Sequence, residues 1–362
     1  MQLPASFPSW LRRLLQPRVP LATKVFLLNH LRVMISAGIP IGHALESLTE
    51  NIEPRSVRPM LQSIRTAVEQ GKPFAESLEA QPALFPPATR ELIRAGESTG
   101  GLEGALTEAA NALRKERELR SRVQNALLYP AIIVATMIII GTGVVFFVLP
   151  QLLDVFRGVT VRLPLTTRVL LTLSDLVGAY AAELLGVGTS MTAAMVVYAT
   201  KSAVGRSLWH RMILHAWKFG RIAREVNIAR ISRTLSGLLR TDVPIVRSLE
   251  LTAATIQNVH YQSALRDAAT AITHGGTLRD SLAHHRDLFP ATVLQMVHVG
   301  EQTSELHTLL GEVADFYESN VDLALRNLTT IIEPILMLVI GAAVAFLAMA
   351  VLQPMYTIAQ SI

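Results

Sequence analysis

The sequence predicts an all-α, polytopic membrane protein with two homologous cytoplasmic six-helix bundle domains and three transmembrane helices. Three observations lead to this fold class. Two long segments contain almost no charged residues, the chain repeats itself at a constant offset, and the polar segments space their apolar residues three and four positions apart. That spacing is typical of helices that bury one stripe, and short turns between such helices favour antiparallel bundles.

The composition favours a membrane protein. Half of the 362 residues are hydrophobic and 17% are charged, whereas ordinary soluble domains are about 25% charged. The chain has no cysteine, which excludes disulfides, zinc–thiolate sites, iron–sulfur clusters and cysteine nucleophiles. A formal net charge of +5 suits either a nucleic-acid partner or the basic cytoplasmic parts of a membrane protein.

Transmembrane helices are predicted where charged residues are absent. No charged residue lies between Arg122 and Asp154, which predicts a span over 129–150. Its apolar run of 19 residues would rise about 28 Å, close to the roughly 30 Å hydrocarbon core of a bilayer. A similar stretch predicts a span over 331–354, and a weaker one predicts a span over 177–200. The alternative for each is a buried core helix, which seldom runs this long without a charge.

The chain contains an internal duplication. A shift of 204 residues superposes its two halves without a gap. The identical pairs include Gly71 and Gly275, Gly96 and Gly300, Glu97 and Glu301, Pro130 and Pro334, and Pro150 and Pro354. Chance does not produce one constant offset over such a length, so we interpret each half as one helical domain followed by one membrane helix.

The duplication also predicts the topology. Two copies of one domain should share a compartment, so the chain must cross the membrane again between them. Lys and Arg number 16 in residues 1–130 and 14 in 201–330, against three in 151–176. Because basic residues favour the cytoplasmic side, both domains are predicted there, with the connector and the C-terminal tail outside. This distribution explains the positive charge without nucleic acid.

The resulting division of the chain has eight parts. They are an N-terminal tail (1–20), a first helical domain (21–128), a first span (129–150), a connector (151–176), a second span (177–200), a second helical domain (201–330), a third span (331–354) and an external tail (355–362).

Six helices are expected in the first domain. Gly38 can end one helix and Pro40 can begin the next, and Gly71 with Pro73 can do the same. The expected ranges are 21–37, 41–51, 56–70, 74–80, 87–97 and 102–122, and the last is expected to continue towards the membrane.

No catalytic chemistry is predicted. Residues 96–100 match the G-x-S-x-G motif of serine hydrolases, but that motif needs a strand before its serine. Here a helix is expected, and the second copy, 300–304, has no serine at that position. We therefore interpret the segment as a structural turn between helices. No phosphate-binding loop of the G-x-x-x-x-G-K-[ST] type occurs, and no histidine spacing suggests a metal, so we expect no enzyme activity, metal or cofactor.

Three glutamates have two possible roles. Glu97 and Glu301 hold equivalent places, where each could bond backbone or a neighbouring arginine such as Arg94, or contact a partner. Glu333 directly precedes Pro334 at a membrane entry. Its carboxylate could be stabilised by the helix dipole, or it could bind the terminal amine or a polar segment of a substrate within the membrane.

The chain resembles the type II secretion system F family, the inner-membrane platform proteins of type II secretion and type IV pilus machines. The resemblance covers about residues 21–360. It is carried by MISAGIPIGHALESL, by the run GKPFAESLEAQPALFPPATRELIRAGESTGGLEGAL and by NALLYP in the first half, and by LLRTDVPIVRSLEL, LFPATVLQMVHVGEQTSELHTLLGEVADFYE and IIEPILMLVIG in the second.

The resemblance implies a non-enzymatic coupling function in the inner membrane. The implied partners are a cytoplasmic hexameric ATPase, other inner-membrane assembly proteins, pilin or pseudopilin subunits, and a second copy of the chain in a dimer. Motif position suggests contact or hinge residues at Gly38, Pro40, Gly96, Glu97, Gly100, Gly300, Glu301 and Glu333.

The second copy departs from the first at two turn positions, and the family resemblance holds despite them. The second copy has Asp242 and Ser304 where the first has Gly38 and Gly100, so we expect its turns to be looser. The alternatives in function are a transporter built from repeats and a membrane-anchored hydrolase that uses Ser98.

Overall fold

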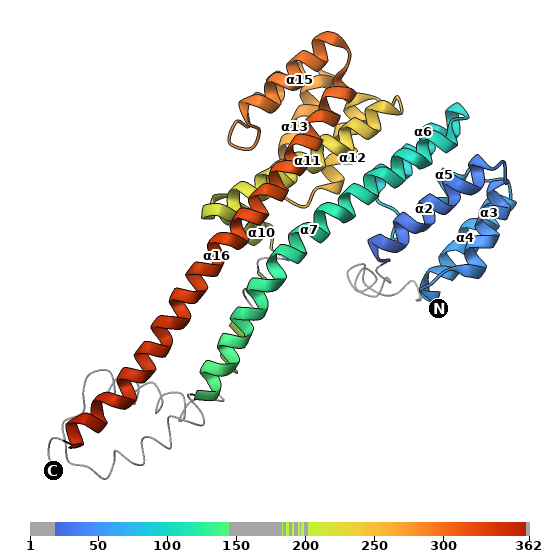
Figure 1. Ribbon diagram of the computed structural model, residues 1–362. Helices are drawn as coiled ribbons and strands as arrows, with labels where there is room; N and C mark the ends of the chain where they lie inside the picture. Colours follow the sequence, from blue (N-terminus) through green and yellow to red (C-terminus); the bar gives the residue numbers. More distant parts are fainter. Residues whose placement is uncertain are drawn as a thin grey trace. The chain divides into compact units, whose positions relative to one another are not determined.

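A computed structural model describes residues 19–144 and 202–359, together with scattered positions between 183 and 198. Every regular element in these residues is helical (Figure 1). The predicted connector, almost all of the predicted N-terminal tail and most of the predicted second span lie outside the described residues.

The first half contains the six predicted helices. They are α2 (Leu21–Ser36), α3 (Ile41–Asn51), α4 (Arg58–Glu69), α5 (Phe74–Glu79), α6 (Pro87–Thr99) and α7 (Leu102–Gly143). A short 3-10 turn, η1 (Arg55–Val57), precedes α4 and accounts for the early start predicted for that helix. As expected, α7 continues towards the apolar stretch, and it passes through Pro130 without ending.

The second half repeats this order from its second helix, α11, onwards. Its helices are α10 (Ala203–His215), α11 (Trp217–Arg240), α12 (Ile245–Thr255), α13 (Val259–Thr273), α14 (Leu278–Ala283), α15 (Ala291–Thr303) and α16 (Leu306–Ala359). The bounds of α12, α14 and α15 lie 204 residues after those of α3, α5 and α6. The duplication inferred from residue identities is therefore also a duplication of helix boundaries.

The turns of the two halves have the same backbone conformation. Gly38 and Gly100 have φ angles of 78° and 75°, in the left-handed region. Their counterparts Asp242 and Ser304 have φ angles of 57° and 61° although both carry a Cβ. The second copy therefore keeps the left-handed turn conformation without glycine, at a steric cost that glycine avoids. Looser turns in the second copy stay a prediction.

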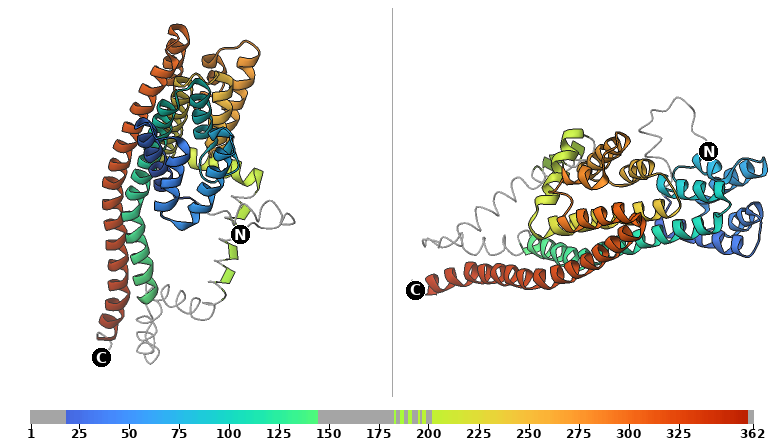
Figure 2. Two further views of the ribbon diagram at one scale, coloured as in Figure 1. Left: turned by 90° about the vertical axis from the view of Figure 1, so that its right-hand side faces the viewer. Right: turned by 90° about the horizontal axis from the view of Figure 1, so that it is seen from above.

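The polar helical parts of both halves form one compact unit, residues 19–121 and 210–321. The predicted apolar stripes are buried here, as Leu28, Leu31 and Leu61 illustrate. The core of the first half also includes Leu238, Val243 and Leu251 of the second half. Figure 2 shows the helices of the first half, blue to green, beside those of the second half, yellow to orange.

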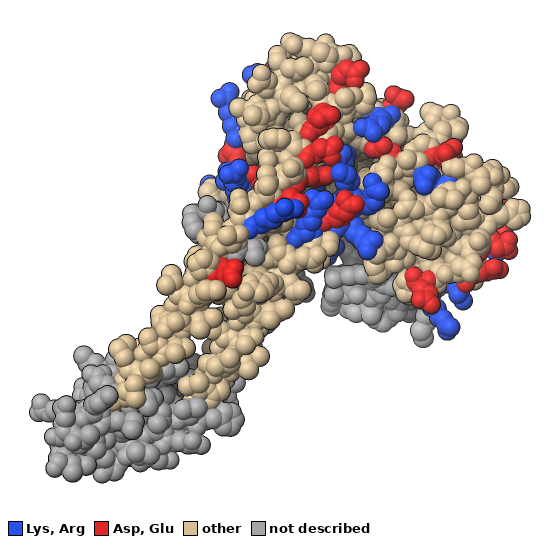
Figure 3. All heavy atoms as spheres, viewed as in Figure 1, with Lys and Arg blue, Asp and Glu red and all other residues tan. Residues whose placement is uncertain are grey.

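The apolar parts of α7 and α16 belong to a second unit, residues 122–209 and 322–362. Both helices are long and apolar enough to cross a membrane. Ile139 and Leu338 are 71% and 74% exposed, so these stretches are not buried core helices. Figure 3 shows almost no charged atoms along them on the visible face. Arg122 of α7 and Asp322 of α16 form an ion pair of 3.3 Å.

Candidate functional site

The two equivalent glutamates bind backbone. Glu97, near the end of α6, accepts hydrogen bonds from the amides of Phe74 (2.6 Å) and Ala75 (2.8 Å) at the start of α5. Glu301 of α15 accepts bonds from the amides of Leu278 (2.6 Å) and Arg279 (3.1 Å) at the start of α14.

These bonds explain why a carboxylate occupies both positions. The first amides of a helix have no partner inside the helix, and the N-terminal end of the helix dipole favours a negative charge. Each glutamate therefore joins two helices that are separated by a loop. The backbone-binding role proposed from the sequence is confirmed, and a role in partner contact stays a prediction.

Glycines next to these glutamates permit close helix approach. A Cβ on Gly96 would overlap the side chain of Ala105 in α7. A Cβ on Gly300 would lie 2.8 Å from the Cα of Leu306 in α16. Gly96, Glu97 and Gly100 thus act together in one helix–turn–helix, whereas Gly38 and Pro40 form the separate turn between α2 and α3.

Ser98 lies in a structural setting. It is near the C-terminal end of α6, and its hydroxyl donates to the backbone oxygen of Ala95 at 2.9 Å. The strand that a nucleophile elbow requires does not precede it, because residues 87–99 form α6.

Glu333 lies exposed on α16, directly before Pro334. It is the only charged residue after Arg326. It belongs to the apolar unit, away in sequence from the other candidate residues, so the structure does not group it with them.

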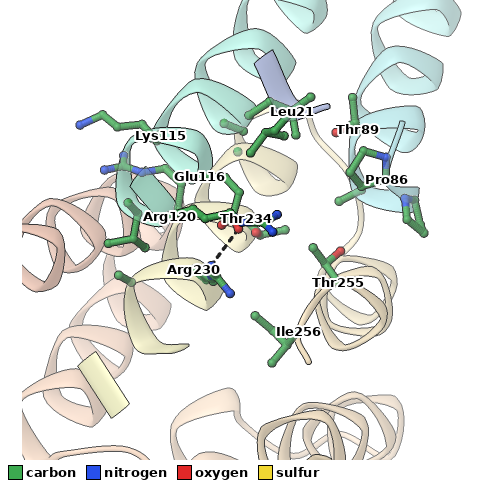
Figure 4. Close-up of a pocket in the computed structure, with 18 of the residues that line it drawn as sticks. Leu21, Pro86, Thr89, Lys115, Glu116, Arg120, Arg230, Thr234, Thr255 and Ile256 are labelled. Atoms are coloured by element: carbon green, nitrogen blue, oxygen red, sulfur yellow. Dashed lines mark ion pairs between the residues drawn. The ribbon is translucent and has the colours of Figure 1, made fainter. Parts of the chain in front are cut away.

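A cavity of about 310 Å³ lies between the two halves (Figure 4). Its lining residues come from α2, α6, α7, α11, α16 and the C-terminal end of α12 with the residues that follow it. Its charged lining residues are Lys115, Glu116, Arg120, Arg230, Arg233 and Glu318. Sequence reasoning did not find this site, because its residues come from both copies and carry no motif.

Ion pairs join the halves around this cavity. Arg230 Nη2 lies 2.9 Å from Glu116 Oε1. Lys115 Nζ lies 3.2 Å from Glu318 Oε2, and Arg233 Nε donates to Glu318 Oε1 at 3.0 Å. Lys115 lies on α7 of the first half, whereas Arg233 and Glu318 lie on α11 and α16 of the second. Glu318 therefore connects three helices from both halves.

Two carboxyl groups in the contact between the halves have shifted pKa values. Burial raises the pKa of Glu116 despite the nearby Arg230 and Arg120. For Asp315 burial acts in the same direction, but bonds with Arg233 and Lys115 outweigh it and lower the pKa of that carboxyl. Two further pairs, Arg240 with Glu108 at 3.4 Å and Arg247 with Glu91 at 3.5 Å, extend the contact between halves.

Comparison with known proteins identifies the family. The family model described as type II secretion system (T2SS), protein F, matches residues 27–150 and 231–354. These ranges are offset by the same 204 residues as the duplication.

Characterised relatives match nearly the whole chain. The type IV pilus assembly protein PilC of Thermus thermophilus is 36% identical, over 91% of this chain and 81% of the relative. PilC of Myxococcus xanthus is 31% identical over 91% and 78%. Type II secretion system protein F of Pseudomonas aeruginosa is 31% identical over 92% and 82%. The chain therefore belongs to the type II secretion system protein F family.

Proposed function

We propose that this protein is the inner-membrane platform of a type IV pilus or type II secretion machine. It would couple a cytoplasmic assembly ATPase to the extraction of pilin or pseudopilin subunits from the membrane. Relatives named for both kinds of machine support this proposal. The chain itself has no phosphate-binding loop motif, so the energy would come from the separate ATPase.

The proposed topology places both helical domains, 21–128 and 201–330, in the cytoplasm. Three spans, at 129–150, 177–200 and 331–354, would anchor them, with the connector outside. The exposed apolar stretches of α7 and α16 support the first and last of these spans, and the distribution of Lys and Arg supports the orientation.

The observation that carries the coupling function is the continuity of α7 and α16. Each runs from the charged unit into its apolar stretch without a break, over 42 and 54 residues. An unbroken helix transmits displacement along its axis, because its backbone hydrogen bonds resist bending and extension. Movement of the cytoplasmic helices would therefore reach the membrane directly.

Partner contacts are proposed at exposed turns and at the membrane entry. The turns at Gly38–Pro40, Gly96–Gly100 and Gly300–Ser304 would face the ATPase or the other inner-membrane assembly proteins. Glu333 would bind an amine or polar segment of the pilin substrate. A carboxylate is expensive to place near hydrocarbon, and such residues commonly serve a ligand.

The test breaks the continuity of α7 after Val123. One variant receives the insertion Gly-Pro-Gly-Gly, and its matched control receives four alanines, which extend the helix by about one turn. In a host that lacks its own copy, we expect the alanine variant to support filament assembly or secretion and the Gly-Pro variant to fail. Membrane insertion and co-purification with the ATPase should persist in both. Full activity of the Gly-Pro variant would exclude coupling through α7.

A further inference from the structure

Helix α10 (Ala203–His215) has no equivalent among the described helices of the first half, which begins with α2. It starts three residues after the end of the predicted second span, 177–200. The division between the two compact units falls inside α10, between Trp209 and His210, just as it falls inside α7 and α16 at the start of their apolar stretches. Helix α10 therefore occupies the passage from the predicted membrane segment to the second helical domain.

The chain turns sharply at both ends of α10. A Cβ on Gly205 would lie 2.3 Å from the carbonyl oxygen of Tyr198, and a Cβ on Gly220 would lie 2.3 Å from the carbonyl oxygen of Leu214. Residues six or seven positions apart in a continuous helix are separated by about 9 to 10 Å along its axis. Each close approach therefore requires a change of direction, and α10 is a separate helix of 13 residues with an orientation of its own.

One face of α10 is apolar and exposed. Val204, Leu208 and Met212, spaced four residues apart, are 61%, 58% and 60% exposed, and this spacing places them in one stripe along the helix. Trp209 lies beside the stripe and is 43% exposed. Leu214, on the other side of the helix, is buried. Helix α10 thus packs on the protein through one face and presents a second apolar face outwards, which is typical of an interaction surface.

The sequence around α10 is positively charged. No acidic residue lies between Glu183 and Glu225. The basic residues in this interval are Lys201, Arg206, Arg211, Lys218, Arg221 and Arg224. At 100° per residue, Arg211 and Arg206 lie at the two edges of the exposed face of α10. Both are exposed, and neither forms an ion pair with the residues that the structure describes. The apolar stripe is therefore bordered on each side by a cation available to an external anion.

We propose that α10 lies in the membrane interface and binds anionic phospholipids. The apolar stripe would enter the boundary between headgroups and acyl chains, a position that also favours Trp209. Arg206 and Arg211 would reach the phosphate oxygens on either side of it. A lipid surface supplies hydrocarbon and negative charge in this order, and the predicted span directly before α10 holds the helix beside the bilayer.

This contact would fix the start of the second helical domain against the membrane surface. Because the chain turns sharply again at Gly220, the lipid-bound α10 would set the direction in which α11 leaves the bilayer. The proposal rests on the membrane topology given under the proposed function and is independent of any coupling to an ATPase.

Spin labels test the position of α10, because the chain has no natural cysteine. Single labels are placed on the full chain in nanodiscs of phosphatidylcholine and phosphatidylglycerol. Labels at Leu208→Cys and Met212→Cys should collide with oxygen more often than with a water-soluble nickel chelate, since oxygen concentrates in hydrocarbon. A label at Arg266→Cys, on the exposed side of α13, should show the opposite preference. Ile139→Cys, on the exposed apolar stretch of α7, provides the reference for lipid.

The three possible results have different meanings. If the nickel chelate reaches the labels at Leu208 and Met212 as readily as the label at Arg266, α10 faces water and the proposal is overturned. If both reagents are excluded, protein covers the stripe, which also overturns the proposal. Failure of the Ile139 label to prefer oxygen would instead contradict the proposed membrane topology, so the two failures are distinguishable.

Fluorescence quenching tests the preference for anionic lipid. In a chain with Trp10→Phe and Trp217→Phe, Trp209 is the remaining tryptophan, and brominated acyl chains quench it on contact. At equal mole fractions, brominated phosphatidylglycerol should quench it more than brominated phosphatidylcholine. Arg211→Gln should lower this preference about fivefold, which corresponds to the roughly 1 kcal/mol that one basic residue gains at an anionic surface. The matched control Arg266→Gln should leave the preference unchanged. Equal quenching by the two lipids before any arginine is replaced would overturn the proposed anionic ligand.

Discussion

The two copies of the helical module build the same short helix in different ways. In the first half α5 follows Pro73, which provides no side-chain cap, so Glu97 is the side chain that binds its first amides. In the second half α14 follows Thr277, whose hydroxyl accepts from the amide of Asp280 at 3.1 Å, in addition to the bonds of Glu301. The bonds from a glutamate to the first amides of the short helix are thus present in both copies, whereas a side-chain cap from the preceding residue is present only in the second.

The turns teach the same lesson about local and tertiary control. Glycine adopts the left-handed conformation without strain, whereas in a residue with a Cβ this conformation brings the Cβ too close to the following carbonyl oxygen. Asp242 and Ser304 nevertheless adopt it. The packing of the helices on either side therefore determines the turn, and the turn residue determines only how much stability is lost there.

The largest expected effect concerns the glycines that permit helix contact. Gly96→Ala should lower the free energy of unfolding by at least about 3 kcal/mol, and Gly300→Ala by about 2 kcal/mol, because each new methyl overlaps a neighbouring helix. Chemical denaturation of the full chain in mild detergent would measure this. Gly104→Ala is the control, since its Cβ would meet nothing within 4 Å, and it should stabilise by about 0.5 kcal/mol. Equal effects at the three sites would contradict the packing argument.

The cap comparison predicts an asymmetry of intermediate size. Glu97→Ala should cost about 2 kcal/mol, because it leaves two amides of α5 without a partner. Glu301→Ala should cost about 1 kcal/mol, because Thr277 still caps α14. The same denaturation experiment measures both. Adding Thr277→Ala to Glu301→Ala should remove the difference between the halves, and a persistent difference would show that another contact is responsible.

Exchange of turn residues should have a smaller effect. Asp242→Gly and Ser304→Gly should each stabilise by up to about 1 kcal/mol, since glycine relieves the left-handed strain. The reverse substitutions Gly38→Asp and Gly100→Ser should destabilise by a similar amount. Melting temperatures of the four variants provide the measurement. Destabilisation by the two glycine substitutions would show that the side chains of Asp242 and Ser304 contribute bonds that outweigh the strain.

The smallest effect is the pH dependence that Asp315 of the second half contributes. Asp315 has a lowered pKa in the folded chain, and its counterpart in the first half is Asn111. A lowered folded pKa stabilises the protein above the ordinary aspartate pKa of about 3.9, and this stability is lost as pH falls through the folded pKa. Asp315→Asn should therefore lower the melting temperature slightly at pH 7 and reduce its fall below about pH 4. Parallel pH profiles for both proteins would exclude this role.

Several features of the protein were determined by the sequence alone. The six helices of the first half, the turns at Gly38 and Gly71, and the duplication follow from nearest neighbours and from periodicity, because helix formation depends on residues three and four positions apart. The apolar stretches after Arg122 and Glu333 could be predicted because absence of charge over such a length has few structural explanations. Family membership was also predictable from the sequence, because the motifs that carry the resemblance are contiguous stretches of residues.

Only the tertiary structure decided which residues act together. Glu97 binds the amide of Phe74, 23 residues away, and Lys115 pairs with Glu318, 203 residues away. The asymmetry that covers Val243 and leaves Ile39 exposed is likewise invisible in two equivalent stretches of sequence. The physical reason is that contacts between helices depend on how whole faces pack, and identical local patterns can be covered in one copy and open in the other.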